Sequence, residues 1–146
     1  MMTYAPRSRS ARATGSYATI GLETEVLSAS PERLISLLFR GALTSLAQAR
    51  HYFQANNIAA RGKAISKAID IVDSGLKAGV DTERGGEVAK LLIASYEIIV
   101  RDLMMANLHN DTEKLASAEK QLGDLAQAWY TAVDPQFQPS STRDPQ

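Results

Sequence analysis

The sequence predicts an all-α protein, an antiparallel four-helix bundle in one domain. Apolar residues recur at three- and four-residue steps along four separate segments, the period of a helix with one buried face. Glycine, proline and paired asparagines stand mainly between those segments, and no stretch alternates like a strand. The length of 146 residues suits a single domain. Amphipathic helices joined by short links favour antiparallel packing.

The first 29 residues are expected to lie outside the four helices. Residues 1–16 are rich in Ser, Arg, Ala and Thr without periodicity, so we predict a flexible arm. Residues 17–29 bring back apolar side chains, including Tyr17, Ile20 and Leu22. They are too few for an independent element, and we expect this segment to lie on the body of the protein.

The first two helices are predicted over residues 31–54 and 57–78. Ser30 can cap the first helix through its hydroxyl, and Pro31 suits the first helical position. Asn56 and Asn57 interrupt the pattern, and Gly79 provides a C-cap for the second helix. The expected buried faces are Leu34, Ile35, Leu38, Ala42, Leu46, Ala49 and Phe53, and then Ile58, Ile65, Ala68, Ile69, Val72 and Leu76.

The last two helices are predicted over residues 83–108 and 111–132. Asp81 and Thr82 are the capping candidates for the third helix, and Asn110 opens a capping-box pattern for the fourth. Pro135 ends any helix, so residues 134–146 are predicted to be a disordered polar tail and residues 17–133 to form the domain. The fourth helix carries a strict apolar seam of Leu115, Ala118, Leu122, Leu125 and Trp129.

Composition argues against several classes of function. Lys plus Arg equals Asp plus Glu at 16 each, so the global charge does not favour nucleic acid or an anionic membrane. The chain has no cysteine, which removes disulfides, thiolate catalysis and most structural zinc sites. His51 and His109 are far apart and in no metal-binding pattern, and no nucleotide-binding motif is present. We therefore expect no catalytic residue, metal or cofactor, no membrane insertion and a cytoplasmic location.

The apolar faces are wider than one packed seam needs. Ile71 widens the face of the second helix. Ile93, Tyr96, Ile98 and Val100 widen that of the third, with Met104 and Met105 near its end. For any one of these residues, core packing is the simpler interpretation. Together they predict a surface that accepts a partner's helix or extended segment.

Residues 17–129 resemble the FliS family of flagellar export chaperones. Its A-S-P-x-x-L-I start is present as Ala29 to Ile35, and the double-glycine segment of its third helix as residues 80–89. Further matches are Tyr17, Gly41-Ala42, Ile65, Lys67, Ala68, Ile71, Val72, Tyr96, Ala106-Asn107 and Ala128-Trp129. The sequence departs from the family pattern at Ser16, Arg40 and Ser95.

The resemblance implies a chaperone that binds the C-terminal segment of flagellin, prevents premature polymerisation and keeps it competent for type III export. It also implies that the segment around Tyr17, Ile20 and Leu22 covers part of the binding surface until flagellin displaces it. An anti-sigma factor and the export gate are further implied partners. The residues expected to form the flagellin groove are Ile58, Ile65, Ile71, Ile93, Tyr96, Val100 and Leu108.

The alternative hypothesis is a helical bundle or adaptor that self-associates and has no flagellin client. The strict seam of the fourth helix and the neighbouring Met104 and Met105 could serve a homodimer. A client chaperone is expected to be a monomer or a weak homodimer when alone.

Overall fold

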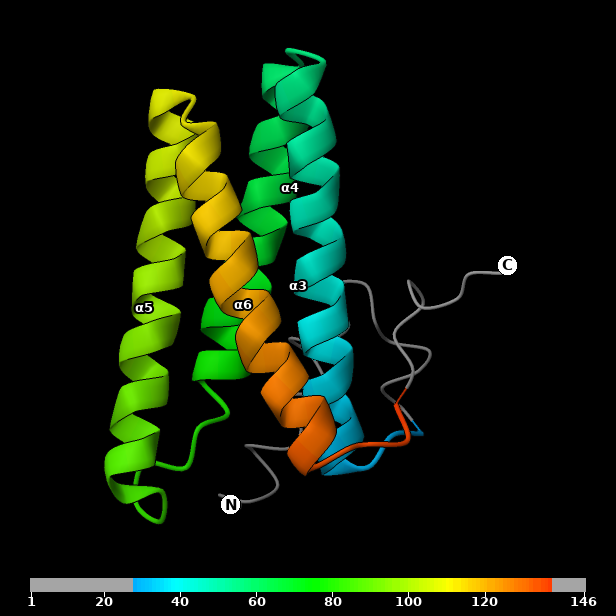
Figure 1. Cartoon of the computed structure of the whole chain (residues 1–146), viewed down its shortest axis with the longest axis vertical. Coiled ribbons are helices and arrows are strands. Elements are labelled where there is room, and N and C mark those ends of the chain that lie inside the picture. Colours follow the sequence, from blue (N-terminus) through cyan, green and yellow to red (C-terminus); the bar gives the residue numbers. More distant parts are fainter. Residues whose placement is uncertain (1–27, 138–146) are drawn as a thin grey trace, which may run out of the picture.

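The computed structural model describes residues 28–137, and these residues form an all-α four-helix bundle. Helix α3 spans Pro31–Gln54, α4 spans Ile58–Asp70, α5 spans Gly86–His109 and α6 spans Thr112–Ala132. A π-helical segment, η1, continues α4 over Ile71–Lys77. Successive helices run in opposite directions, and α6 returns across the front of the bundle to the start of α3 (Figure 1). The predicted fold class is confirmed. The arm, the segment with Tyr17, Ile20 and Leu22, and residues 138–146 of the predicted tail lie outside the described residues. Residues 134–137, which were also predicted to belong to the disordered tail, are described, and Asp134 and Phe137 are buried against the bundle.

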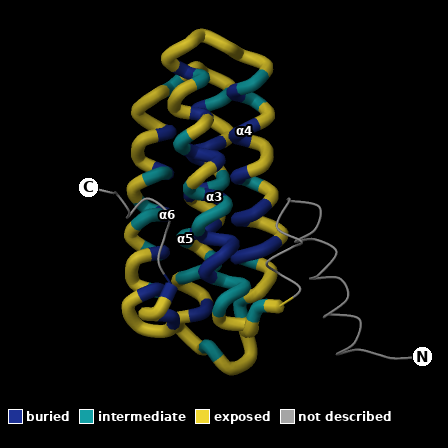
Figure 2. Tube along the Cα trace, turned by 90° about the vertical axis from the view of Figure 1, so that its right-hand side faces the viewer, coloured by how far each residue is buried: buried dark blue, intermediate teal, exposed yellow. Residues whose placement is uncertain are grey.

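The core runs along the centre of the bundle, where the four helices face one another (Figure 2). Leu38 and Leu46 of α3, Ile65 of α4, Ile99 of α5 and Leu122 of α6 are at most 1% exposed. Each large buried aliphatic side chain contributes roughly 1.5–3 kcal/mol. Apolar residues at the helical period are therefore the main reason why these segments fold together.

Short polar side chains cap the starts of α3, α4 and α6, though not always the expected ones. The Ser30 hydroxyl accepts a hydrogen bond from the Arg33 backbone N–H at 3.1 Å, as predicted. The cap of α6 is Asp111, whose carboxylate accepts from the backbone N–H groups of Glu113 and Lys114. Asn110, the expected start of a capping box, instead ends α5 in the left-handed conformation, with φ of 55°. The prediction was displaced by one residue because Asn is also a favoured C-cap.

Helix α5 begins at Gly86, later than the predicted residue 83. Asp81 caps a turn instead, its carboxylate accepting from the backbone N–H groups of Glu83 and Arg84. A Cβ at Gly85 would stand 2.6 Å from the Ala89 Cβ, and Gly86 has a φ of +56°. A side chain at Gly85 would clash with Ala89, and one at Gly86 would be strained by the positive φ. The double glycine therefore forms the turn that leads into the helix, which starts at Gly86.

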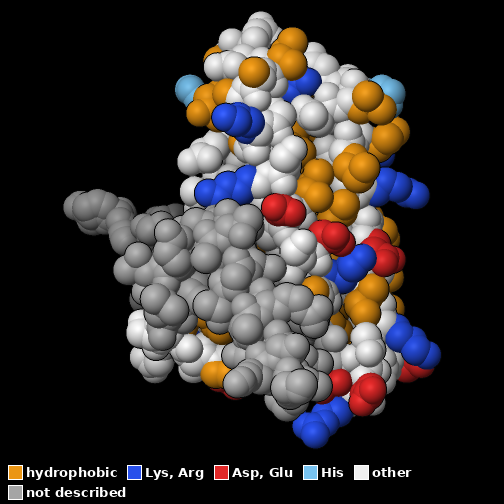
Figure 3. Space-filling view, turned by 180° about the vertical axis from the view of Figure 1, so that it is seen from behind, with side chains coloured by type: hydrophobic (Ala, Val, Ile, Leu, Met, Phe, Trp, Pro, Cys, Tyr) orange, Lys and Arg blue, Asp and Glu red, His pale blue; other side chains and the backbone are white. Residues whose placement is uncertain are grey.

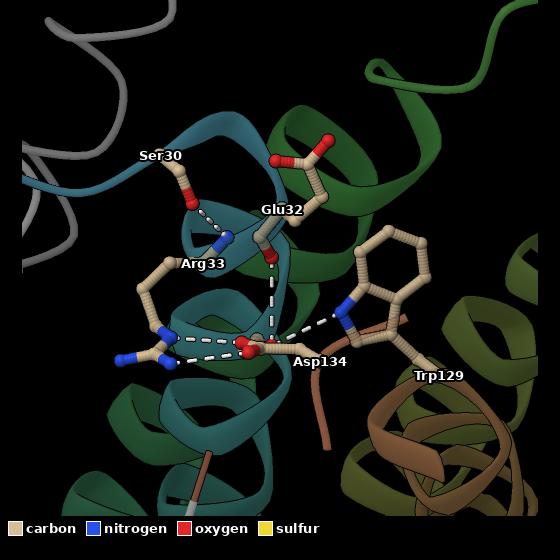
Figure 4. A network of polar contacts seen from close by, with 6 residues as sticks. Ser30, Glu32, Arg33, Trp129 and Asp134 are labelled. Atoms are coloured by element: carbon tan, nitrogen blue, oxygen red, sulfur yellow. Dashed lines mark hydrogen bonds and ion pairs between the residues drawn. The ribbon is translucent and has the colours of Figure 1, made fainter. Parts of the chain in front are cut away.

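A polar network joins the end of α6 to the start of α3 (Figure 4). Arg33 donates from Nε and Nη2 to the two carboxylate oxygens of Asp134, at 2.8 and 3.1 Å. Ser36 donates to Asp134 at 2.6 Å, and the Trp129 indole N–H donates to the Ser36 hydroxyl at 3.0 Å. The hydrogen bonds from Arg33, and then from Ser36, hold the pKa of Asp134 below its usual value. Phe137 packs against Tyr130 and beneath Arg33, which closes this end of the bundle.

Candidate functional site

Exposed apolar surface is concentrated on one helix. Within residues 28–137, eight large apolar side chains are exposed, and six of them belong to α5: Val88, Leu91, Ile98, Met104, Met105 and Leu108. The same helix also buries Tyr96, Ile99 and Leu103 in the core. A helix that only packed in a bundle would need one apolar stripe, so α5 has more apolar surface than the fold uses.

Apolar side chains also lie along the side of α5 nearer to α4, and together with one residue of α4 we call them the apolar strip. It consists of the exposed Ile58 of α4 and, on α5, the half-buried Ile93 and Val100 and the exposed Met104 and Leu108. The α5 members follow one another by seven, four and four residues, so they share a face of the helix. Arg61, three residues after Ile58, contacts Asn107 and Asn110, which places the first turn of α4 beside the last turn of α5. From behind, hydrophobic side chains gather over the upper part of the molecule (Figure 3).

A second row on α5 consists of Leu91, Ile98 and Met105, at intervals of seven residues. It borders α6, because Asp102, between Ile98 and Met105, accepts a hydrogen bond from Gln121 of α6 at 3.1 Å. Helix α5 thus exposes apolar side chains toward both of its neighbours.

The seven residues predicted for the groove fall into three levels of burial. Ile58 and Leu108 are 68% and 74% exposed, whereas Ile93 and Val100 are half-buried. Ile65, Ile71 and Tyr96 lie in the core at 1%, 0% and 4% exposure, and burial raises the pKa of the Tyr96 hydroxyl to about 12. Four of the seven residues, one on α4 and three on α5, are thus at least partly accessible to solvent. The other three lie inside the bundle.

The predicted groove list omitted Met104 and the row of Leu91, Ile98 and Met105. Their signal was present in the sequence as spacing, since Met104 stands four residues from both Val100 and Leu108. Periodicity alone could not separate the buried stripe of α5 from the exposed ones, because apolar residues surround most of this helix.

An arginine fixes the end of the strip. Arg61 is only 7% exposed and donates from Nε to the Asn107 side-chain oxygen at 3.1 Å, and from Nη2 to the Asn107 backbone carbonyl at 3.0 Å. Its Nη1 donates to the Asn110 side-chain oxygen at 2.8 Å, and the guanidinium lies 4.7 Å from the centre of the Phe53 ring. All its partners in the described part of the chain are neutral. These contacts hold the first turn of α4 against the last turn of α5.

An ion-pair cluster lies farther along the same side. The Lys77 ammonium of η1 is 3.1 Å from an Asp73 carboxylate oxygen and 3.3 Å from one of Glu97 on α5. These hydrogen bonds, that of Asp73 first, raise the pKa of Lys77. Glu97 stands between Ile93 and Val100 in the sequence of α5, so the cluster interrupts the strip with charge.

Between residues 28 and 137, no group of three or more His, Asp or Glu side chains could hold a metal ion. His51 and His109 are both exposed, each in the last turn of a helix. No helix within these residues is long and apolar enough to cross a bilayer. The main candidate for function is the exposed apolar surface of α5.

Comparison with known proteins gives consistent matches across the bundle. Residues 13–136 match the model of the family described as flagellar protein FliS. The flagellar secretion chaperone FliS of Salmonella typhimurium is 45% identical over 113 residues, which cover 77% of this chain and 84% of that protein. FliS of Escherichia coli is 38% identical over 135 residues, covering 92% and 97%. FliSB of Pseudomonas aeruginosa is 39% identical over 118 residues, covering 81% and 93%.

Proposed function

The chain belongs to the FliS family of flagellar secretion chaperones, and from that premise we propose that it binds the C-terminal segment of flagellin in the bacterial cytosol. Binding would keep this segment from polymerising before export. The observation that carries the proposal is the apolar surface of α5, which the bundle does not use for its own packing.

The proposed contact surface is the apolar strip. An amphipathic segment that lies along it would cover Ile58, Met104 and Leu108 and bury more of Val100. Ile65, Ile71 and Tyr96 then support the surface from within the bundle, and they contact the client only if the bundle rearranges. Methionine suits such a surface because its flexible side chain adapts to different partners.

We also propose that Tyr17, Ile20 and Leu22 cover part of this surface in the absence of flagellin. The client would have to displace them, so the segment would lower the apparent affinity. An anti-sigma factor and the export gate remain proposed further partners, without residues assigned to either.

The alternative of a self-associating bundle loses one of its supports. Leu115, Ala118 and Leu122 of the α6 seam are at most 2% exposed, packed against the rest of the same chain. That seam is therefore not free for a second copy, and a homodimer would have to use another surface.

Calorimetry tests the proposal with a peptide of about 40 residues from the C-terminus of flagellin, a length able to bury the roughly 1,000–3,000 Å² typical of coupled folding and binding. We expect tight binding with a strongly negative heat-capacity change, and tighter binding by a chain that starts at residue 25. Absence of binding by both forms would refute the flagellin client.

A further inference from the structure

Three cations stand on α4 and α5 between the ion-pair cluster of Lys77 and the end of the strip that holds Ile58 and Leu108. Lys63 and Lys67 are exposed on α4, and Arg101 is exposed on α5. Within residues 28–137, none of these three side chains forms an ion pair. Seen from behind, Lys and Arg side chains border the upper hydrophobic area on both sides (Figure 3). An apolar surface with unpaired cations on both sides favours a partner with carboxylates beside its apolar residues.

Arg61 strengthens the positive potential at this end. It is buried, and its partners in the described part of the chain are the Asn107 and Asn110 oxygens and the Phe53 ring, so no carboxylate there cancels its charge. A charge in a medium of low dielectric constant is screened less than one in water. At the same end of the bundle, the carboxylate of Asp111 is engaged in capping α6.

The potential reverses farther along the same side. Asp73 and Glu97 share the single ammonium of Lys77, which leaves one negative charge in that cluster. Asp70, exposed at the end of α4, adds another. Along α4, Lys63 and Lys67 precede Asp70 and Asp73, and along the antiparallel α5, Arg101 lies between Glu97 and Leu108. The positive charges therefore lie on the Ile58 and Leu108 side of the negative charges, and the negative charges lie on the Ile93 side.

We infer that this side of α4 and α5 receives an amphipathic helical segment of the client in one orientation, set by charge. Its acidic residues lie over Lys63, Lys67 and Arg101, and its basic residues lie over Asp70, Asp73 and Glu97. The inference rests on the proposed function and adds to it the chemistry of the bound segment and its direction.

The experiment uses the full chain and the flagellin C-terminal peptide, with association rates measured by stopped flow at low and high salt. In the K63E/K67E and R101E variants, we expect association at low salt to slow by about tenfold, and the loss to shrink at high salt. The control is K120E, which reverses an exposed lysine of α6 paired with Asp124, and it should associate like the wild type. A peptide whose carboxylates are replaced by lysine should bind K63E/K67E faster than it binds the wild type.

The outcomes separate this inference from the proposed function. If the wild type does not bind the peptide at all, the proposed function fails. If the wild type binds, but K63E/K67E and R101E associate as fast as K120E at low salt, the charge-set orientation is overturned. Circular dichroism verifies that each variant keeps its helices.

Discussion

Helices α5 and α6 are antiparallel neighbours of 24 and 21 residues, yet they distribute their apolar side chains differently. Between Thr112 and Ala132, every large apolar side chain is buried or half-buried. Helix α5 buries a comparable stripe and exposes six further large apolar side chains. The apolar side chains of α6 are used in packing the bundle. The additional apolar surface of α5 is not, and binding of a client would account for it.

The strongest test of this difference substitutes charge on the exposed side of α5. Two apolar contacts contribute roughly 3–6 kcal/mol to binding, so Met104→Glu with Leu108→Glu should weaken binding of the flagellin peptide by at least about 100-fold. The free energy of unfolding should change little, because Met104 and Leu108 are 57% and 74% exposed. Calorimetry and urea unfolding measure the two quantities. Ala116→Glu with Ala128→Glu, at exposed positions of α6, is the matched control and should bind normally.

The reciprocal test removes buried volume from α6. Leu122 is fully buried, so Leu122→Ala should lower the free energy of unfolding by about 2–5 kcal/mol. Met104→Ala, on exposed α5 surface, should change it by less than about 0.5 kcal/mol. Urea titration of both variants gives the comparison, and equal losses of stability would contradict the assignment of α5 surface to a partner.

A smaller effect is expected where the chain leaves α6. Asp134→Asn removes the ion pair with Arg33, and because Arg33 is partly exposed to solvent the loss should be about 1–2 kcal/mol at neutral pH. The folded pKa of Asp134 lies below its usual 3.8. Its stabilising effect is therefore complete above about pH 3.8 and is lost as the pH falls through the lower folded value. Urea unfolding as a function of pH should show the wild type and Asp134→Asn converging in acid.

The smallest effect concerns a single oxygen atom. The Tyr130 hydroxyl is buried without a hydrogen-bond partner among the described residues. Tyr130→Phe should therefore leave stability within about 1 kcal/mol of the wild type, on the stabilising side. Tyr130→Ala removes a ring that contacts Phe39 and Phe137, and should cost roughly 3 kcal/mol or more. Thermal unfolding of the two variants separates the roles of hydroxyl and ring, and a large loss in Tyr130→Phe would show that the hydroxyl is bonded.

The helices could be predicted from the sequence wherever one signal dominated. Residues 31–54 were placed correctly because Ser30 and Pro31 give an unambiguous start and the Asn56-Asn57 pair a clear end. The second helix was expected to be a uniform α-helix to residue 78, but it becomes π-helical at Ile71. This segment packs against α3 and α5, and the apolar periodicity of the sequence does not distinguish a short π-helical segment from a continuing α-helix.

The candidate site was harder to predict than the fold. Ile71 and Tyr96 were chosen because they widen an apolar face, but a wide face can be buried by neighbours on two sides, as theirs is. The direction of each side chain depends on how the helices rotate about their axes. The contacts of Arg61 could not be predicted for the same reason. Nothing near it in the sequence indicates that its guanidinium donates hydrogen bonds to Asn107 and Asn110.

The network of Arg33, Ser36, Trp129 and Asp134 brings the first turn of α3 beside the residues that follow α6. The two ends of the described chain therefore lie close together. The same four helices could be connected in a different order along the chain. A circular permutant that joins residue 137 to residue 28 through a short linker, with new termini between Asn56 and Asn57, should keep all four helices. Its new ends would lie beside Ile58, so a fluorophore attached there would report directly on the arrival of a partner at the strip.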